Sequence, residues 1–241
     1  MSDDFWDLEA LADARGLGDW QFAQAAPHAR GTVAEVGAGI GTFSERLLHA
    51  GVDDLLLVEP EHACVERLRE RFGADRRVTI SDETLPASPA LAALSGRCDL
   101  VLCQNVLEHI ADDGAAVAAM GRALSPDGVL IVLVPAHPRL FGALDRAYGH
   151  ERRYTRERLR QLAGQADLDV VDLYSFNALG IVGWWVKTRF SPNPRLDPRS
   201  LRWYERLLRG WRPIEDRINL PVGLSVILVA RQRRTSTTQS P

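Results

Sequence analysis

Short runs of apolar and β-branched residues alternate along this chain with stretches whose apolar residues recur at helical spacing. The predicted strands are residues 32–36, 55–59, 78–80, 99–103, 129–134, 169–174 and 224–230. The predicted helices are residues 42–50, 61–72, 114–123 and 155–166. Apolar strands bounded by helices indicate a parallel sheet with both faces covered. We therefore expect an α/β protein with a doubly wound, Rossmann-like sheet.

Residues typical of helix ends and turns mark the boundaries between these elements. Thr155 is a predicted N-cap, and residues 125–128 form a predicted turn leading into the fifth strand. We interpret residues 1–241 as one domain. Its expected parts are an N-terminal helical cap (1–30), a ligand-binding core (31–176), a helical insertion or lid (177–222), the last strand (223–231) and a disordered tail (232–241).

Composition narrows the classes of protein that the chain can belong to. With 241 residues, 46% hydrophobic and 25% charged, it has an ordinary globular composition. Three cysteines without paired spacing argue against a disulfide scaffold or a structural zinc site, and we predict no metal ligands. No apolar run approaches the ~20 residues that span a bilayer, and the acidic N-terminus does not resemble a signal peptide. We expect a cytoplasmic protein without a transmembrane segment.

The charge is unevenly distributed. Residues 187–234 contain 12 basic and 4 acidic residues, although the whole chain has a net charge of −3. A basic C-terminal third suits an anionic substrate or a membrane surface. Because Lys187 is the single lysine, a bias toward arginine codons is an alternative explanation.

The loop after the first predicted strand, Glu35-Val-Gly37-Ala-Gly39-Ile-Gly41, has the strongest chemical signature. Glycines there let a ligand approach bare backbone at a helix N-terminus. The spacing is GxGxG, whereas a dinucleotide loop reads GxGxxG. Glu35 is poorly placed beside a pyrophosphate but suits an ammonium group, and Glu59 at the end of the second strand suits a ribose diol.

The segments AEVGAGIGTFS, LVEP, CDLVLCQNVLEHI and RALSPDGVLIVLVPAHPRLFG resemble successive motifs of class I S-adenosylmethionine-dependent methyltransferases. The resemblance covers about residues 30–175. It implies a seven-stranded sheet whose last strand is antiparallel. It also implies that S-adenosylmethionine is the cofactor, with S-adenosylhomocysteine as the product.

The same resemblance implies roles for individual residues. Glu35, Gly37 and Gly39 would hold the methionine end of the cofactor, and Glu59 the ribose. Asp82 would reach the adenine amine, although Ser81 stands where the family usually has glycine, which leaves Glu83 as the alternative. The remaining expected cofactor contacts are Gln104 and Asn105, near the sulfonium, and Trp20, in the N-terminal cap.

The loop after the fifth predicted strand, residues 135–155, contains two His, an Asp, two Tyr and four Arg. Long loops of this kind are usually functional. Part of it also resembles a bacterial methyltransferase subgroup with a PAHxxLFG…D…GHxRRYT pattern, associated with glycan or natural-product pathways.

A hydroxyl or carbon-acid acceptor would benefit from a general base, and imidazole titrates in the right range. For a hydroxyl, His137 is the first candidate and His150 the second. His109, in the loop after the fourth strand, is a further candidate, although that segment is also expected to shape the cofactor pocket.

The acceptor itself is expected to be a small molecule. Arg152 and Arg153 are candidates for binding an anionic part of it. Tyr148, Tyr154 and Trp184 complete the predicted acceptor-binding residues.

The predicted insertion carries Trp184 and Trp185, and a helix over 201–211 with an apolar face. That face comprises Leu201, Tyr204, Leu207, Leu208 and Trp211. A lid over the core is one interpretation. A lipophilic acceptor pocket, a membrane-docking patch and a homodimer contact are the alternatives.

Together these features predict a methyltransferase acting on a small molecule, with oxygen favoured over nitrogen or carbon as the acceptor atom. An NAD-type oxidoreductase is disfavoured by the glycine spacing and Glu35. A non-catalytic module that keeps the cofactor pocket is the third hypothesis. A nucleic-acid substrate is not expected, because residues 104–107 read Gln-Asn-Val-Leu and no RNA-binding domain is recognisable.

Overall fold

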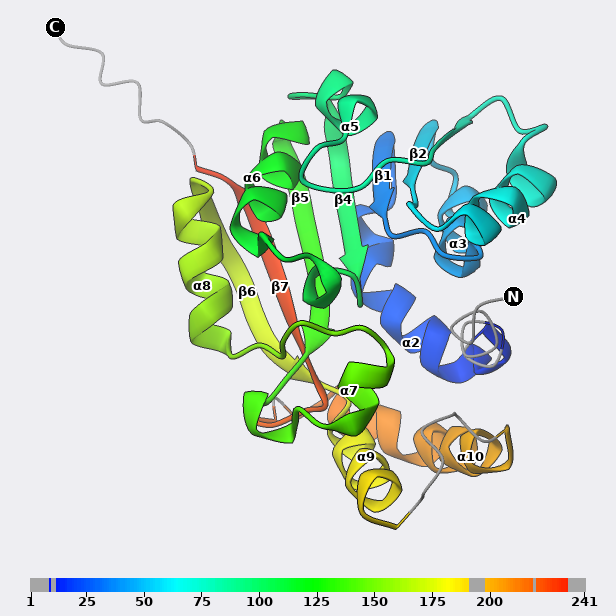
Figure 1. The fold of residues 1–241 in the computed structure, drawn as a ribbon, viewed down its shortest axis with the longest axis vertical. Helices are drawn as coiled ribbons and strands as arrows, with labels where there is room; N and C mark the ends of the chain where they lie inside the picture. Colours follow the sequence, from blue (N-terminus) through cyan, green and yellow to red (C-terminus); the bar gives the residue numbers. More distant parts are fainter. Residues whose placement is uncertain (1–8, 10–11, 191–197, 219, 234–241) are drawn as a thin grey trace, which may run out of the picture.

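The computed structural model describes residues 9, 12–190, 198–218 and 220–233. Within them, seven strands form one mixed sheet in the order β3-β2-β1-β4-β5-β7-β6 (Figure 1). The strands are β1 Thr32–Val36, β2 Asp54–Val58, β3 Val78–Ser81, β4 Cys98–Gln104, β5 Leu124–Pro135, β6 Leu168–Phe176 and β7 Ser225–Gln232. Only β7 runs antiparallel to its neighbours β5 and β6. The Rossmann-like fold predicted from the sequence is confirmed.

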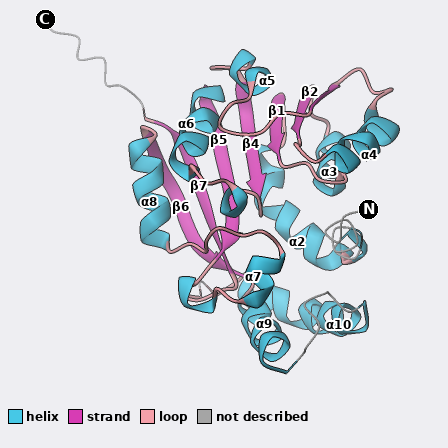
Figure 2. Ribbon diagram, viewed as in Figure 1, coloured by secondary structure: helices cyan, strands magenta, loops and turns pink. Residues whose placement is uncertain are grey.

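Helices cover both faces of the sheet (Figure 2). One face packs against α5 Pro89–Ala93, α6 Asp113–Ala123 and α8 Arg156–Gln165. The other packs against α2 Arg15–Ala25, α3 Thr42–Ala50, α4 His62–Phe72 and α10 Pro198–Glu215. Buried aliphatic side chains fill the two interfaces, as expected for strands that are apolar on both sides. Thr155 caps α8 by accepting a hydrogen bond from the Arg158 N–H, as predicted.

The short elements lie mostly in the loops that follow the strands. They are η1 Ala26–His28, η2 Leu107–His109, η3 Pro138–Leu140 and α7 Ala143–Ala147, with the longer α9 Ala178–Phe190 after β6. Because β1 to β5 are parallel, the loops after them meet at one edge of the sheet, and η2 and α7 lie there. Ligands of doubly wound sheets bind at this edge.

Several predicted boundaries differ from the structure. The sequence analysis missed α5, a five-residue helix too short to show periodicity. It also placed a turn at residues 125–128, whereas β5 already begins at Leu124. The pairing of β4 with β5 shifts register between Cys98 and Leu100, so these turn-forming residues are accommodated as an irregularity within the strand.

The predicted tail, residues 232–241, overlaps the end of the last strand. β7 continues to Gln232, whose side-chain amide donates to the carbonyls of Gly121 and Leu124. Residues 234–241 lie outside the described residues, as do 1–8 of the predicted N-terminal cap.

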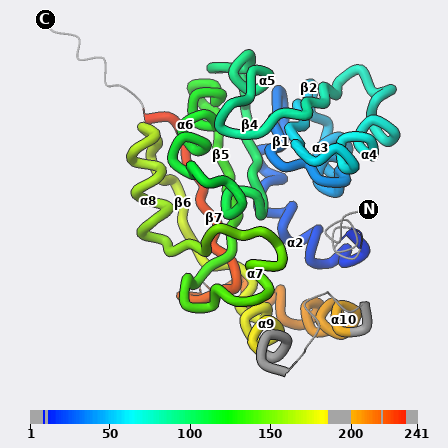
Figure 3. Tube along the Cα trace, in the orientation of Figure 1, coloured from blue at the N-terminus to red at the C-terminus, as the bar shows by residue number. Residues whose placement is uncertain are grey.

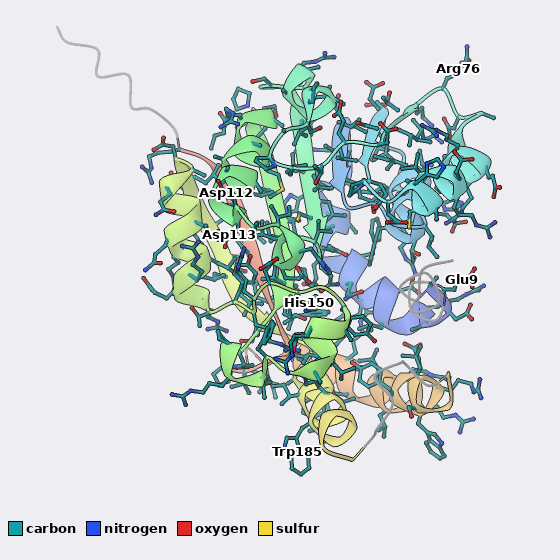
Figure 4. All side chains as sticks on the ribbon, in the orientation of Figure 1. Glu9, Arg76, Asp112, Asp113, His150 and Trp185 are labelled. Carbon is teal, nitrogen blue, oxygen red and sulfur yellow. The ribbon has the colours of Figure 1, made fainter. Side chains whose placement is uncertain are left out.

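The segment between β6 and β7 forms α9 and α10, which pack against each other at one end of the molecule (Figure 3). On α10, Leu208 is 2% exposed and belongs to the core, but Leu207 is 59% exposed. Both residues belong to the predicted apolar face of this helix, so only part of that face is buried against the core. Exposed apolar side chains also include Trp203 on α10 and Trp185 on α9, which projects from the body of the protein (Figure 4).

No helix among the described residues combines the length and the apolar character needed to cross a membrane.

A carboxylate joins the α9–α10 segment to the N-terminal region. Both oxygens of Glu205 on α10 accept backbone hydrogen bonds at the start of α2, from Gly16 and Leu17, each at 2.9 Å. A negative charge at a helix N-terminus is favourable, because the first N–H groups of a helix have no partner within it.

We expect Glu205→Ala to lower the free energy of unfolding by about 1–3 kcal/mol, because two backbone donors lose their acceptor. Urea denaturation measures this change, and amide hydrogen exchange at Gly16 and Leu17 should accelerate. Arg209→Ala, an exposed change on the same helix, is the control. Equal stability of the two variants would show that Glu205 does not tie α10 to α2.

Candidate functional site

The glycine loop after β1 lies at the carboxyl edge of the sheet. Gly37, Gly39 and Gly41 all have positive φ, at 73°, 54° and 82°. A Cβ added at Gly37 would lie 2.1 Å from Cγ2 of Val106 in the loop after β4. The Gly37 backbone therefore packs so closely against Val106 that a larger residue would displace it.

The two glutamates beside this loop are both buried. The Glu59 carboxylate accepts from the Gly39 N–H at 2.8 Å and from the Glu61 N–H at 3.0 Å, so it fixes the path of the glycine loop. Glu35, 4% exposed at the end of β1, accepts from the Ser44 hydroxyl at 2.6 Å. Burial raises the pKa of Glu35 to about 8, and the Ser44 hydrogen bond only partly opposes this effect.

A cavity of about 260 Å³ opens beside the glycine loop. Its lining is contributed by the ends of β1 and β2 and by the loops after β3 and β4. The lining residues are Val36, Gly37, Val58, Pro60, Glu83, Thr84, Leu85, Val106, His109, Ile110 and Ala111. Apolar walls with few polar groups are typical of a small-molecule site.

The loop after β4 brings further polar groups to this edge. Both side-chain amide atoms of Gln104 are buried and have no hydrogen-bond partner among the described residues. Asn105 adopts a left-handed backbone with φ 53°, and its N–H donates to the Leu133 carbonyl at 2.8 Å. Since buried amides are almost always paired, the unpaired Gln104 amide suggests a place for a ligand.

Beside the cavity, Glu108, His109 and His150 form one cluster, with a ligand-type atom of each residue within 4.8 Å of the others. The His109 and His150 rings meet edge to face, with centroids 4.8 Å apart. Glu108 is fully buried, and burial raises its pKa to about 8. His109 also lines the cavity, so the cluster and the cavity are adjoining parts of one site.

Asp145 orients this cluster from α7. Its carboxylate accepts from the Gly142 N–H at 2.8 Å and the Arg153 guanidinium at 2.6 Å, and lies 3.1 Å from Nδ1 of His150. Burial alone would raise the pKa of Asp145, but these hydrogen bonds outweigh it and hold the pKa below its ordinary value. Asp145 is therefore the charged partner of His150 (labelled in Figure 4).

The arginines of the same loop are engaged within the protein. Arg152 donates to the carbonyls of Ile110 and Ala111, at 2.6 and 3.0 Å. Arg153 binds Asp145 and the Ala136 carbonyl, and its guanidinium stacks 4.5 Å from the Trp184 ring centroid. These donors hold the loop against η2 and α7, and the predicted contact of the two arginines with an anionic acceptor stays a prediction.

Two other predicted contacts lie in the core. Trp20 is 1% exposed, packs against Phe176 with ring centroids 4.2 Å apart, and donates its indole N–H to Asp216. Tyr154 is equally buried, and its hydroxyl donates to the Leu107 carbonyl at 3.1 Å. Both residues therefore have structural contacts within the protein, and their predicted contacts with the cofactor and the acceptor stay predictions.

Asp82 and His137 belong neither to the cavity lining nor to the Glu108–His109–His150 cluster. The Asp82 side chain is 69% exposed and lies 3.9 Å from Arg69. The neighbouring Glu83 lines the cavity, although its carboxylate also accepts hydrogen bonds from Ser88 and Ala90. His137 caps η3 with φ 60°, and it is not part of the His109–His150 cluster.

Sequence reasoning did not assign Glu108 and Asp145 to the site. The signal for Asp145 was its spacing from His150 in a loop rich in ionisable residues. Glu108 directly precedes His109 in the chain, but its complete burial could not be read from the sequence.

The chain is similar in sequence to known proteins. Residues 15–173 match a family model described as a methyltransferase domain. Two curated relatives are the ubiquinone biosynthesis O-methyltransferases of Methylococcus capsulatus (30% identical over 119 residues, 46% of each chain) and Bordetella avium (26% over 110 residues, 45% of each chain). The matched region thus spans about half the length of these relatives.

Two solved structures are similar over most of their length. An S-adenosylmethionine-dependent methyltransferase from Mesorhizobium loti has a TM-score of 0.60 and 16% identity, covering 91% of this chain and 100% of that one. A geranyl diphosphate methyltransferase in complex with SAM has a TM-score of 0.64 and 14% identity, covering 88% and 84%. At these identities the likeness is one of fold.

We expect Gly37→Ala to destabilise the protein more than Gly51→Ala, which has an equally positive φ but nothing within 4 Å of the added Cβ. Both variants strain the backbone, but only the first displaces Val106 in the cavity wall. Chemical denaturation of the two variants measures the difference. Equal losses would mean that the contact of Gly37 with Val106 is loose in solution.

Proposed function

The chain belongs to the class I S-adenosylmethionine-dependent methyltransferases, and we propose that it methylates a hydroxyl group of a small molecule. The observation that carries this proposal is the arrangement at the carboxyl edge of the sheet. A glycine loop with two buried glutamates lies on one side of the cavity, and an imidazole–carboxylate cluster adjoins it. The O-methyltransferase relatives favour oxygen over nitrogen or carbon as the acceptor atom.

The residues at the glycine loop fit this cofactor. The Gly37 backbone leaves no room for a side chain, and the Gln104 amide is buried without a partner among the described residues. When bound, S-adenosylmethionine supplies a methyl group on a positively charged sulfur. We assign Glu35 to the ammonium of its methionine end, with Gly37 and Gly39 presenting backbone, and we assign Glu59 to the ribose hydroxyls.

Two further assignments concern the adenine and the sulfonium. Glu83 is our candidate for the adenine amine in place of Asp82, because it borders the cavity whereas Asp82 is exposed. Gln104 ends β4 and Asn105 follows it, and both are our candidates near the sulfonium.

At the acceptor side, methylation of a neutral hydroxyl releases one proton. We propose that this proton is taken up at the cluster by Nε2 of His150. Asp145 accepts from Nδ1–H of His150, which fixes the ring tautomer and leaves Nε2 as the basic nitrogen. This pairing favours His150 over His137 as the base, while His109 forms the wall between the cluster and the cavity.

Tyr148 and Trp184 are our candidates for binding the body of the acceptor. Tyr148 lies beside His150, with ring centroids 6.1 Å apart, and Trp184 covers Arg153 from α9. Two aromatic side chains near the base favour a flat, apolar acceptor over the anionic one suggested by the sequence.

Glu35 gives the cofactor site a pH dependence. With a pKa of about 8 its carboxyl is mostly neutral at pH 7, but a bound ammonium favours the carboxylate. Binding of S-adenosylhomocysteine should therefore release a proton, and affinity should rise by up to about tenfold per pH unit between pH 6 and 8. Isothermal titration calorimetry in buffers of different ionisation enthalpy measures both quantities.

In that experiment Glu35→Gln should bind more weakly and release no proton. NADH serves as the competing ligand, because tight NADH binding without a response to S-adenosylhomocysteine would favour an oxidoreductase. A pH-independent affinity without proton release would contradict the assignment of Glu35.

The acceptor side is tested by turnover. Incubation with S-adenosylmethionine and a panel of phenols and cell extracts should yield a product heavier by one CH₂, detected by mass spectrometry. His150→Gln should lower kcat by about 10²–10⁴-fold, the usual contribution of a general base, while retaining affinity for S-adenosylhomocysteine. Loss of turnover in His137→Gln but not in His150→Gln would reverse our choice of base. Cofactor binding without any methylated product would favour the non-catalytic module.

A further inference from the structure

We propose that Glu108, His109 and His150 bind one divalent transition-metal cation of the zinc type, beside the cavity. The three residues come from two separate segments, η2 and the loop after α7, and their donor atoms lie within 4.8 Å of one another. Two imidazoles and one carboxylate are the donor set of many catalytic zinc centres, where the fourth position stays open for a substrate or water.

The state of Glu108 is the first argument for a cation. Both carboxylate oxygens are buried, and neither has a hydrogen-bond partner among the described residues. The nearest ionisable nitrogen is Nε2 of His150, 3.9 Å from Oε1. A buried carboxylate in this state is costly, and a cation placed between these atoms would satisfy it.

The second argument is the support behind His150. Metal-binding histidines usually donate the other ring N–H to a carboxylate, which fixes the tautomer and the ring orientation. Asp145 occupies that position at Nδ1, 3.1 Å away, so that Nε2 is the nitrogen on the Glu108 side. Asp145 is in turn fixed by Gly142 and Arg153.

The spacing is also close to what a cation requires. Two ligands of a tetrahedral zinc ion are roughly 3.3 Å apart, given metal–ligand bonds of about 2.0–2.1 Å. Nε2 of His150 and Oε1 of Glu108, at 3.9 Å, lie near this separation, whereas the widest donor pair, at up to 4.8 Å, must close further when a cation binds. The Arg153 guanidinium is paired with Asp145, so its charge is balanced there.

The donor set also selects among cations. Mg²⁺ and Ca²⁺ prefer oxygen ligands, whereas imidazoles suit zinc, cobalt, nickel and copper. We therefore expect binding of Zn²⁺ or Co²⁺ that a large excess of Mg²⁺ does not displace.

The consequence for catalysis rests on the proposed function, which positions the acceptor hydroxyl at this cluster. A cation held by Glu108, His109 and His150 would lower the pKa of an acceptor hydroxyl beside it, and the released proton would pass to water. His150 would then be a metal ligand, and the cation would replace it as the group that promotes deprotonation.

Titration of the full, chelator-treated chain with Co²⁺ tests the site directly. We expect one equivalent to bind, with visible absorption of a low-coordinate cobalt ion, and Zn²⁺ but not Mg²⁺ to displace it. Glu108→Gln and His150→Gln should each weaken binding by at least 100-fold, and Asp145→Asn by about 10–100-fold through the orientation of His150. His49→Ala, an exposed histidine on α3, should leave Co²⁺ binding unchanged.

Failure of the unaltered chain to bind Co²⁺ stoichiometrically would overturn the site, whether or not the variants fold. Unchanged Co²⁺ binding in folded Glu108→Gln and His150→Gln, judged by circular dichroism, would overturn it as well. S-Adenosylhomocysteine titration of the same samples separates the two proposals. Loss of metal binding with intact S-adenosylhomocysteine binding rejects only the metal site, and the reverse result rejects only the assigned cofactor pocket.

Discussion

The loop between β5 and α8 depends on one buried carboxylate. Asp145 holds Gly142, His150 and Arg153 at once, so it determines the conformation of the loop between β5 and α8. Arg152 and Tyr154 then fasten the end of this loop to η2, which carries Glu108 and His109. Because each buried donor or acceptor needs its partner, removal of Asp145 would leave several groups unpaired together.

The glycine-loop side of the site is organised differently. There the parallel strands fix the positions of the loops, and side-chain contacts between the loops refine them. Gly37 follows β1 and Glu59 follows β2, and these paired strands end in register, with Val36 opposite Val58. The Glu59 carboxylate then links the two loops through the Gly39 N–H. The two sides of the site meet at the loop after β4, where Val106 contacts the glycine loop and His109 belongs to the cluster.

The sheet and the glycine loop could be predicted from the sequence because their signals are local. Apolar runs of strand length, closely spaced glycines and an acid at the end of a strand each reflect a requirement within a few residues. The antiparallel last strand came from the family resemblance, and the order of the strands was not predicted.

The roles of residues in the loop after β5 could not be predicted in the same way. An arginine that binds a substrate and one that binds a buried aspartate look alike in a sequence. Arg153 was expected to bind the acceptor, yet it pairs with Asp145 and the Ala136 carbonyl. The position of Trp20 could not be predicted either, because its burial depends on Phe176 and Asp216, which are distant in the chain. Such assignments require long-range contacts.

The way the α9–α10 segment joins the sheet has a consequence for how this enzyme could diversify. Its two ends, Phe176 and Ser225, are directly paired partners on β6 and β7. The segment therefore leaves and rejoins the sheet at one pair of neighbouring residues. The entropic cost of closing such a loop grows only logarithmically with its length. Natural selection can therefore change the length of this part of the chain at low entropic cost, provided that Leu208 keeps its place in the core and Glu205 its contact with α2.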